Sequence, residues 1–135
     1  MIGLDTNILA RYLLDDDPRW SPLVARFFDE SLSPQKRGYI NPITLAELVW
    51  VLRRRPEYSR AMLATVIEGL LASERLVVGE AQAVRRALVS FKAGSAGFAD
   101  YLIAELNEAA GASPTVTLDR QAAKTFPFVP FSQEA

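Results

Sequence analysis

The chain has 135 residues, a net charge of −1 and 50% hydrophobic residues, which is the composition of a compact globular domain. It contains neither cysteine nor histidine, which excludes disulfides, zinc sites built on thiolate or imidazole, and Ser–His–Asp triads. Acid–base chemistry must then come from carboxylates, lysines, tyrosines or water bound to a metal ion.

Short apolar segments alternate with longer segments whose apolar residues recur at helical spacing. In chain order we expect a strand at 1–4, helices at 8–13 and 21–32, a strand at 38–40, helices at 44–52 and 63–71, a strand at 76–79, helices at 81–91 and 99–110, a strand at 115–118, a short helix at 119–124 and an edge strand at 128–131. Strands that alternate with helices pair in parallel. The pattern therefore predicts an α/β fold, a three-layer α/β/α sandwich with a central, mainly parallel sheet, forming one domain over residues 1–135.

The helix expected at 44–52 is apolar on nearly all sides. A helix of this kind is usually covered twice, by the core and by a partner. Trp50 and Val51 are therefore expected in the core, and a homodimer face on this helix is a second possibility.

No stretch approaches the roughly 18–20 uncharged apolar residues that cross a membrane. Asp5 also comes too early for the apolar region of a signal peptide. We therefore expect a cytoplasmic protein with no membrane partner.

Four acidic residues fall near the ends of expected strands or on expected helices: Asp5, Glu47, Asp100 and Asp119. The carboxyl ends of parallel strands meet at one edge of a sheet, so the four could face one cleft. Two carboxylates about 4 Å apart repel by about 4 kcal/mol at an effective dielectric near 20, so such a cleft needs a counter-cation. Oxygen ligands suit Mg²⁺ or Mn²⁺, which can activate water and offset charge on a phosphate.

Each acid also has a purely structural explanation. Asp5 and Asp119 could be helix caps, and Asp100 could complement the positive end of its helix. Glu47 could complete a capping box that begins at Thr44.

Three polar neighbours of these acids, Thr6, Asn7 and Thr117, allow two interpretations as well. They could orient the acids or hold metal-bound water. Alternatively, Thr6 and Asn7 make local cap bonds and Thr117 is an ordinary strand residue.

The chain resembles the PIN-domain family in four short motifs that occur in the family's order and spacing. They are Leu-Asp-Thr-Asn-Ile-Leu around Asp5, Thr-Leu-Ala-Glu-Leu around Glu47, Phe-Ala-Asp-Tyr-Leu-Ile-Ala around Asp100 and Val-Thr-Leu-Asp-Arg around Asp119. A stand-alone PIN domain of this size resembles the VapC toxins of bacterial toxin–antitoxin pairs. One departure is Gln121, which stands where some relatives carry a further acid and puts a second metal in doubt.

The resemblance implies an endoribonuclease that uses Mg²⁺ or Mn²⁺, with Asp5, Glu47, Asp100 and Asp119 as the metal-holding and catalytic acids. Thr6 and Thr117 match the family's hydroxyl positions. The resemblance also implies an RNA substrate, a homodimer and a small VapB-type antitoxin that blocks the active site.

Basic residues give weaker indications of an RNA-binding surface. Arg11, Lys92 and Arg120 are candidate RNA contacts, although they are scattered along the chain. The arginine run at 53–55 could bind phosphate, or could simply occupy a helix C-terminus, where cations are favourable.

Two alternatives to a nuclease stay open. One is a non-catalytic PIN-like module that binds RNA or protein. The other is an aspartyl-phosphate phosphatase or a receiver-like switch, which also uses an Asp after a parallel strand. A haloacid-dehalogenase-type phosphatase would carry a second Asp where Asn7 stands, and a receiver would carry a phosphorylatable Asp where Glu80 follows the strand expected at 76–79.

Overall fold

The computed structural model describes residues 1–125 and 127–132, and it contains two compact units, Met1–Gly79 and Glu80–Ala135. Each unit has its own parallel sheet and its own helices. The α/β class expected from the sequence is therefore confirmed. That all residues from 1 to 135 form one domain stays a prediction. Every helix in the described part of the chain is too short or too polar to cross a lipid bilayer.

The first unit is built on a three-stranded parallel sheet in the order β1-β2-β3. The strands are β1 (Ile2–Gly3), β2 (Gly38–Ile40) and β3 (Leu76–Val78), which agree closely with the expected positions. The backbone N–H of Leu4 donates to the Tyr39 carbonyl at 2.9 Å, so the pairing of β1 continues to the residue before Asp5.

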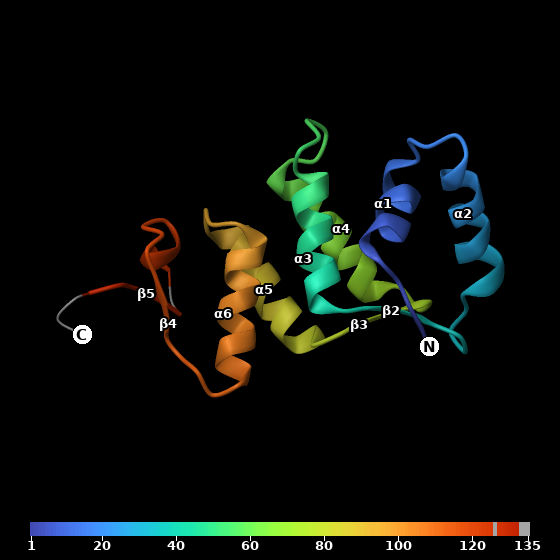
Figure 1. The fold of residues 1–135 in the computed structure, drawn as a ribbon. Helices are drawn as coiled ribbons and strands as arrows, with labels where there is room; N and C mark the ends of the chain where they lie inside the picture. Colours follow the sequence, from blue (N-terminus) through green and yellow to red (C-terminus); the bar gives the residue numbers. More distant parts are fainter. Residues whose placement is uncertain (126, 133–135) are drawn as a thin grey trace. The chain divides into compact units, whose positions relative to one another are not determined.

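Four helices connect these strands: α1 (Thr6–Leu14), α2 (Trp20–Ser31), α3 (Pro42–Leu52) and α4 (Arg60–Ala72). Figure 1 shows them on one side of the three strands. This follows from topology, because crossovers between parallel strands are right-handed and the two crossovers here advance in the same direction across the sheet.

The core of the first unit lies between this face of the sheet and the four helices. Strand residues alternate in burial, with Ile40 fully buried and its neighbour Tyr39 half-buried. The helices contribute Leu48, Leu52 and Ile67, none of which has measurable exposure. At about 25 cal/mol per Å² of apolar surface, burial of such side chains is the main stabilising contribution.

The first turn of α3 differs from the expectation. The helix starts at Pro42, because the Asn41 side-chain oxygen accepts from the backbone N–H groups of Ile43 (2.7 Å) and Thr44 (3.0 Å). Pro42 occupies the first turn, where its missing N–H costs no hydrogen bond. The alternative in which Glu47 completes a capping box that begins at Thr44 is therefore wrong, because the N-cap of α3 is Asn41.

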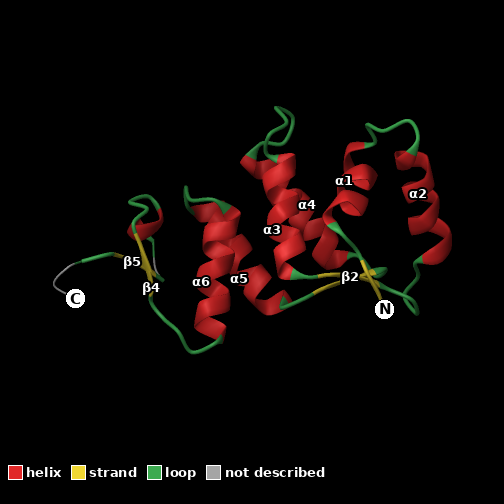
Figure 2. Ribbon diagram, in the orientation of Figure 1, coloured by secondary structure: helices red, strands yellow, loops and turns green. Residues whose placement is uncertain are grey.

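The second unit begins with two packed helices, α5 (Ala81–Ala93) and α6 (Phe98–Ala109) (Figure 2). The aromatic rings of Phe91 and Phe98 meet edge to face with centroids 5.9 Å apart. Arg86 on α5 donates to the buried Glu105 carboxylate on α6 at 2.9 Å. The helix expected at 81–91 is longer than predicted, because α5 continues through Ala93.

A two-stranded parallel sheet completes the second unit. β4 (Thr115–Thr117) pairs with β5 (Phe128–Pro130), and Tyr101 on α6 contacts Phe128 edge to face at 6.2 Å. Within its described sheet β5 pairs only with β4, and a proline is tolerated on such an edge strand. The short helix expected at 119–124 is only the 3₁₀ turn η1 (Ala122–Lys124).

Candidate functional site

Asp5 stands at the carboxyl end of β1, directly before α1. It is the N-cap residue of that helix, and its Oδ1 accepts from the Thr6 backbone N–H at 2.7 Å. The expected capping role is therefore real, but it uses only one carboxylate oxygen. The side chain is exposed, and its other oxygen makes no hydrogen bond within the described part of the first unit.

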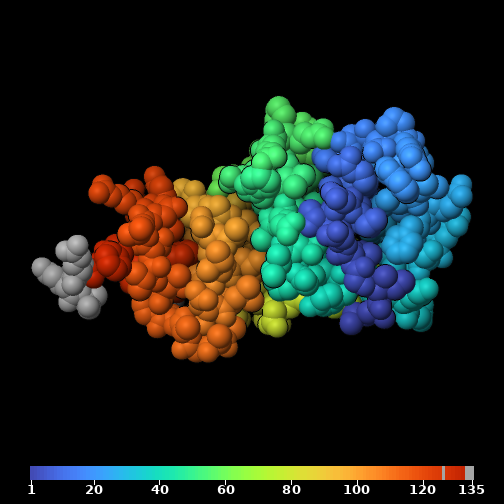
Figure 3. Space-filling view, viewed as in Figure 1, coloured from blue at the N-terminus to red at the C-terminus, as the bar shows by residue number. Residues whose placement is uncertain are grey.

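Glu47 is joined to the same point of the fold by a long-range hydrogen bond. The Thr6 hydroxyl donates to Glu47 Oε2 at 3.3 Å, although the two residues are 41 positions apart in the chain. Thr6 is only 7% exposed, so its hydroxyl is held in place by packing. Thr6 thus contacts Asp5 through its N–H and Glu47 through its hydroxyl, and brings the two carboxylates to one site. Figure 3 shows α1 and α3 side by side on the face in view, in agreement with their direct contacts.

A cavity of about 310 Å³ opens beside Asp5. It is lined by Gly3, Leu4, Asp5, Tyr39, Asn41 and Thr44. A Cβ added at Gly3 would meet no atom within 4 Å, so this wall of the cavity borders open space. Asn41 was not among the site residues predicted from the sequence; the signal for it was the Asn-Pro pair directly after a predicted strand.

Asn7 occupies a different environment. It lines a second cavity, of about 390 Å³, between α1 and α2, together with Ile8, Arg11, Asp17, Trp20 and Val24. No hydrogen bond joins the side chain of Asn7 to either acid within the described part of the first unit. Of the three supporting residues proposed from the sequence, Thr6 has hydrogen bonds to both acids of this unit. The role of Asn7 stays a prediction.

The remaining two acids belong to the second unit. Asp100 lies in the first turn of α6, where its Oδ2 accepts from the Gly97 backbone N–H at 3.2 Å. This is the position at which a negative charge complements the helix dipole. Asp119 follows β4, and its Oδ1 accepts from the backbone N–H groups of Gln121 (2.8 Å) and Ala122 (3.3 Å).

Thr117 is the residue that orients the turn carrying Asp119. Its hydroxyl accepts the backbone N–H of Asp119 at 3.0 Å, which fixes the chain where it leaves β4. This contact is made to the backbone of the acid and not to its carboxylate, and the supporting role of Thr117 stays a prediction.

The four carboxylates share properties that suit a hard divalent cation. Each is exposed or half-exposed, and none pairs with a lysine or arginine inside its own unit among the residues described. In neither unit alone do three acids gather into a group that could hold a metal. The Asp5–Glu47 pair supplies carboxylate oxygens of the kind that Mg²⁺ and Mn²⁺ prefer, so these residues fit such an ion.

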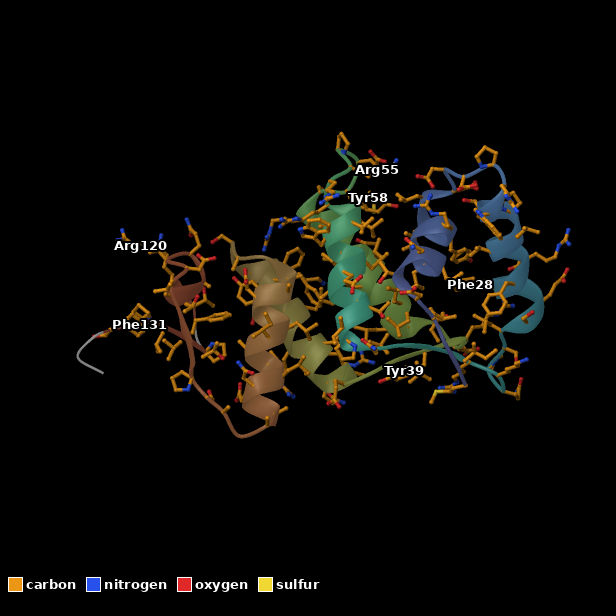
Figure 4. The ribbon with its side chains drawn as sticks, viewed as in Figure 1. Phe28, Tyr39, Arg55, Tyr58, Arg120 and Phe131 are labelled. Carbon is orange, nitrogen blue, oxygen red and sulfur yellow. The ribbon has the colours of Figure 1, made fainter. Side chains whose placement is uncertain are left out.

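Two arginines among the candidate RNA contacts form ion pairs with one carboxylate. Arg11 forms an ion pair with Asp16 at 3.0 Å, and Arg55 of the arginine run pairs with the same carboxylate. Figure 4 places Arg55 next to Tyr58 at the turn after α3. Lys92 lies in the last turn of α5, and Arg120 is exposed in the turn after β4. Asp16 therefore neutralises part of the charge of Arg11 and Arg55.

Comparison with known protein families shows to which family the chain belongs. The sequence matches the PIN domain family over residues 2–126. The chain belongs to the PIN domain family. PIN domains are generally nucleases and commonly use divalent metal ions, and the helices and parallel strands described above are consistent with the PIN-like α/β/α fold. Among curated proteins, no sequence is similar enough to count as a match.

Proposed function

We propose that this PIN domain is a metal-dependent endoribonuclease of the VapC toxin type. It would hydrolyse RNA phosphodiester bonds with Mg²⁺ or Mn²⁺ held by Asp5, Glu47, Asp100 and Asp119. The observation that carries the proposal is the double contact of the buried Thr6, which joins a carboxylate after β1 to a carboxylate on α3. A capping role alone explains the first contact and leaves the second unexplained.

The protein's own residues have defined tasks in this scheme. Asp5 and Glu47 provide oxygens that remain exposed to solvent while Thr6 holds both side chains in place. When bound, the ion would lower the pKa of its water and offset negative charge on the phosphate. Thr117 fixes the backbone at Asp119, and the α6 N-terminus stabilises the charge of Asp100.

The test is cleavage of a mixed RNA pool by the purified protein in Mn²⁺ or Mg²⁺, compared with EDTA. Asp5→Asn and Asp119→Asn should abolish cleavage. Asp29→Asn is the matched control, because the Asp29 side chain is 72% exposed and pairs only loosely with Arg75, at 3.6 Å. Full activity of both site variants would contradict the proposed acids.

The chemistry of the product ends distinguishes this reaction from cleavage by a contaminating ribonuclease that attacks through the RNA's own 2′-hydroxyl. Attack by water leaves a linear phosphate end, whereas attack by the RNA's own 2′-hydroxyl leaves a 2′,3′-cyclic phosphate. We expect linear ends only. If the protein binds neither Mn²⁺ nor Mg²⁺ and cleaves nothing, a non-catalytic RNA- or protein-binding module becomes the better account.

Two partners belong to the same proposal. We propose a homodimer, and a small VapB-type antitoxin that inhibits cleavage. The first is tested by sedimentation of the purified chain. The second is tested by co-expression with the product of any small gene adjacent to the one that encodes this chain, which should abolish RNA cleavage.

A further inference from the structure

Helix α3 carries a large aromatic residue on its solvent side. Trp50 is 48% exposed, and Ile43 on the same helix is 70% exposed, so the described part of the first unit buries only one side of α3. This corrects the expectation that Trp50 belongs to the core. In helix geometry, residues three apart lie about 60° from each other around the axis and about 4.5 Å along it. Trp50 therefore lies on the same side of α3 as Glu47, one turn further along.

An arginine covers one face of this indole. The guanidinium carbon of Arg54 lies 3.5 Å from the centroid of the Trp50 ring, in a cation–π arrangement. The neighbouring Arg53 is also exposed, and no carboxylate pairs with Arg53 or Arg54 within residues 1–125 and 127–132. The end of α3 thus presents an aromatic surface together with positive charge.

We propose that Trp50 and Arg54 form a stacking platform for one unpaired base of single-stranded RNA. Every nucleobase has a flat aromatic face that stacks on an indole or a guanidinium plane, and the arginine charge attracts the adjoining phosphates. A base held one helical turn from Glu47 brings the flanking phosphodiester toward that acid. The inference rests on the proposed nuclease function and extends it, because it favours single-stranded RNA over a duplex.

The chain contains a matched control for this pair. Trp20, on α2, is 49% exposed, and the Arg19 guanidinium lies 4.7 Å from its ring centroid. The two tryptophans thus have nearly the same exposure and the same kind of neighbour, but of the two only Trp50 shares a helix with a candidate acid. A non-specific contribution of exposed Trp–Arg pairs to RNA binding would appear at both positions.

The experiment measures binding of a fluorescein-labelled oligoadenylate by fluorescence anisotropy in EDTA, so that neither metal binding nor cleavage contributes. Trp50→Ala should weaken binding about 5- to 150-fold, the usual cost of removing one stacked base. Trp50→Phe, which keeps a ring, should retain most of the affinity, and Trp20→Ala should change little. Arg54→Ala should reduce the dependence of log affinity on log salt by about one unit.

Circular dichroism and thermal melting check that each variant is folded. Equal RNA affinities of the wild type, Trp50→Ala and Trp20→Ala would overturn the platform. A change in sedimenting mass of Trp50→Ala with unchanged RNA affinity would also overturn it, and would make this side of α3 an interface between copies. Failure of the platform can be distinguished from failure of the nuclease proposal. Cleavage by the wild type, with no effect of Trp50→Ala on RNA binding, rejects the platform alone. Loss of RNA binding in Trp50→Ala, with no cleavage by the wild type, rejects the nuclease alone.

Discussion

Replacement of Thr6 by valine tests the proposed positioning of the two first-unit acids. Valine has nearly the shape of threonine but lacks the hydroxyl that donates to Glu47 Oε2. The bond is 3.3 Å long, beyond the usual 2.5–3.0 Å for such bonds, and Glu47 is exposed. Its net contribution to the free energy of unfolding is therefore at the low end of the normal range, about 0.5 kcal/mol.

The expected effect on metal binding is larger than the effect on stability. Loss of a residue that orients a metal ligand typically weakens metal affinity by about 10- to 100-fold, which corresponds to about 1.4–2.8 kcal/mol. The Thr6→Val variant should therefore melt within a few degrees of the wild type and yet bind Mn²⁺ at least about tenfold more weakly. Thr6→Ser, which keeps the hydroxyl, should bind Mn²⁺ almost as the wild type does.

Calorimetric titration with Mn²⁺ and urea unfolding are the two assays. Thr65→Val is the matched control, because the Thr65 hydroxyl donates to the Ala61 carbonyl within α4 at 3.1 Å and contacts neither acid. Wild-type Mn²⁺ affinity in Thr6→Val would refute the positioning role. Equal weakening in Thr6→Val and Thr65→Val would show that loss of a hydroxyl is not specific to the site.

Three further predictions concern the fold around the site and the second unit. Asn41→Ala should lower the free energy of unfolding in urea by about 0.5–2 kcal/mol, while Asn41→Asp should retain most of it, since aspartate also caps α3. Gly94→Ala should cost about 1–3 kcal/mol, because the added Cβ would collide with the Tyr101 hydroxyl, and the cost should be smaller in a Tyr101→Phe background. The backbone N–H of Trp20 holds the pKa of Asp17 below its ordinary value of 3.8. Ionised Asp17 therefore stabilises the fold above that pH. This contribution is lost as the pH falls through the lower pKa of Asp17 in the folded state. The difference in urea stability between the wild type and Asp17→Asn should therefore be constant near neutral pH and should decrease below 3.8; an unchanged difference in acid would contradict it.

Local signals in the sequence predicted the elements well. The strand expected at 38–40 is β2 with the same bounds, and the helix expected at 21–32 differs from α2 by one residue at each end. Asp5 was predicted as a possible helix cap, and it is the N-cap residue of α1. These features depend on alternation, helical spacing and cap chemistry, all of which act over a few residues. The start of α3 was misplaced because two capping signals, Asn41 and Thr44, compete within one turn, and the first satisfies two N–H groups.

Long-range contacts could not be predicted in this way. The bond between Thr6 and Glu47 depends on how α3 packs against α1, which no periodicity encodes. The exposure of Trp50 was also missed. An apolar residue on an apolar helix is normally buried, so the sequence predicted burial. Only the packed structure shows which side of α3 the core leaves uncovered. The family resemblance supplied the order of the four acids, but not the hydrogen bonds that hold each of them.

The most direct test of the proposed function is the Mn²⁺ affinity of three single variants, measured by calorimetric titration. Asp5→Asn and Glu47→Gln each remove a charged ligand and keep the shape of the side chain, and Asp29→Asn removes an exposed carboxylate outside the site. The account predicts that the first two bind Mn²⁺ at least about tenfold more weakly than the wild type, and that the third binds it as the wild type does. Equal affinity in all four proteins would contradict a metal held by these carboxylates.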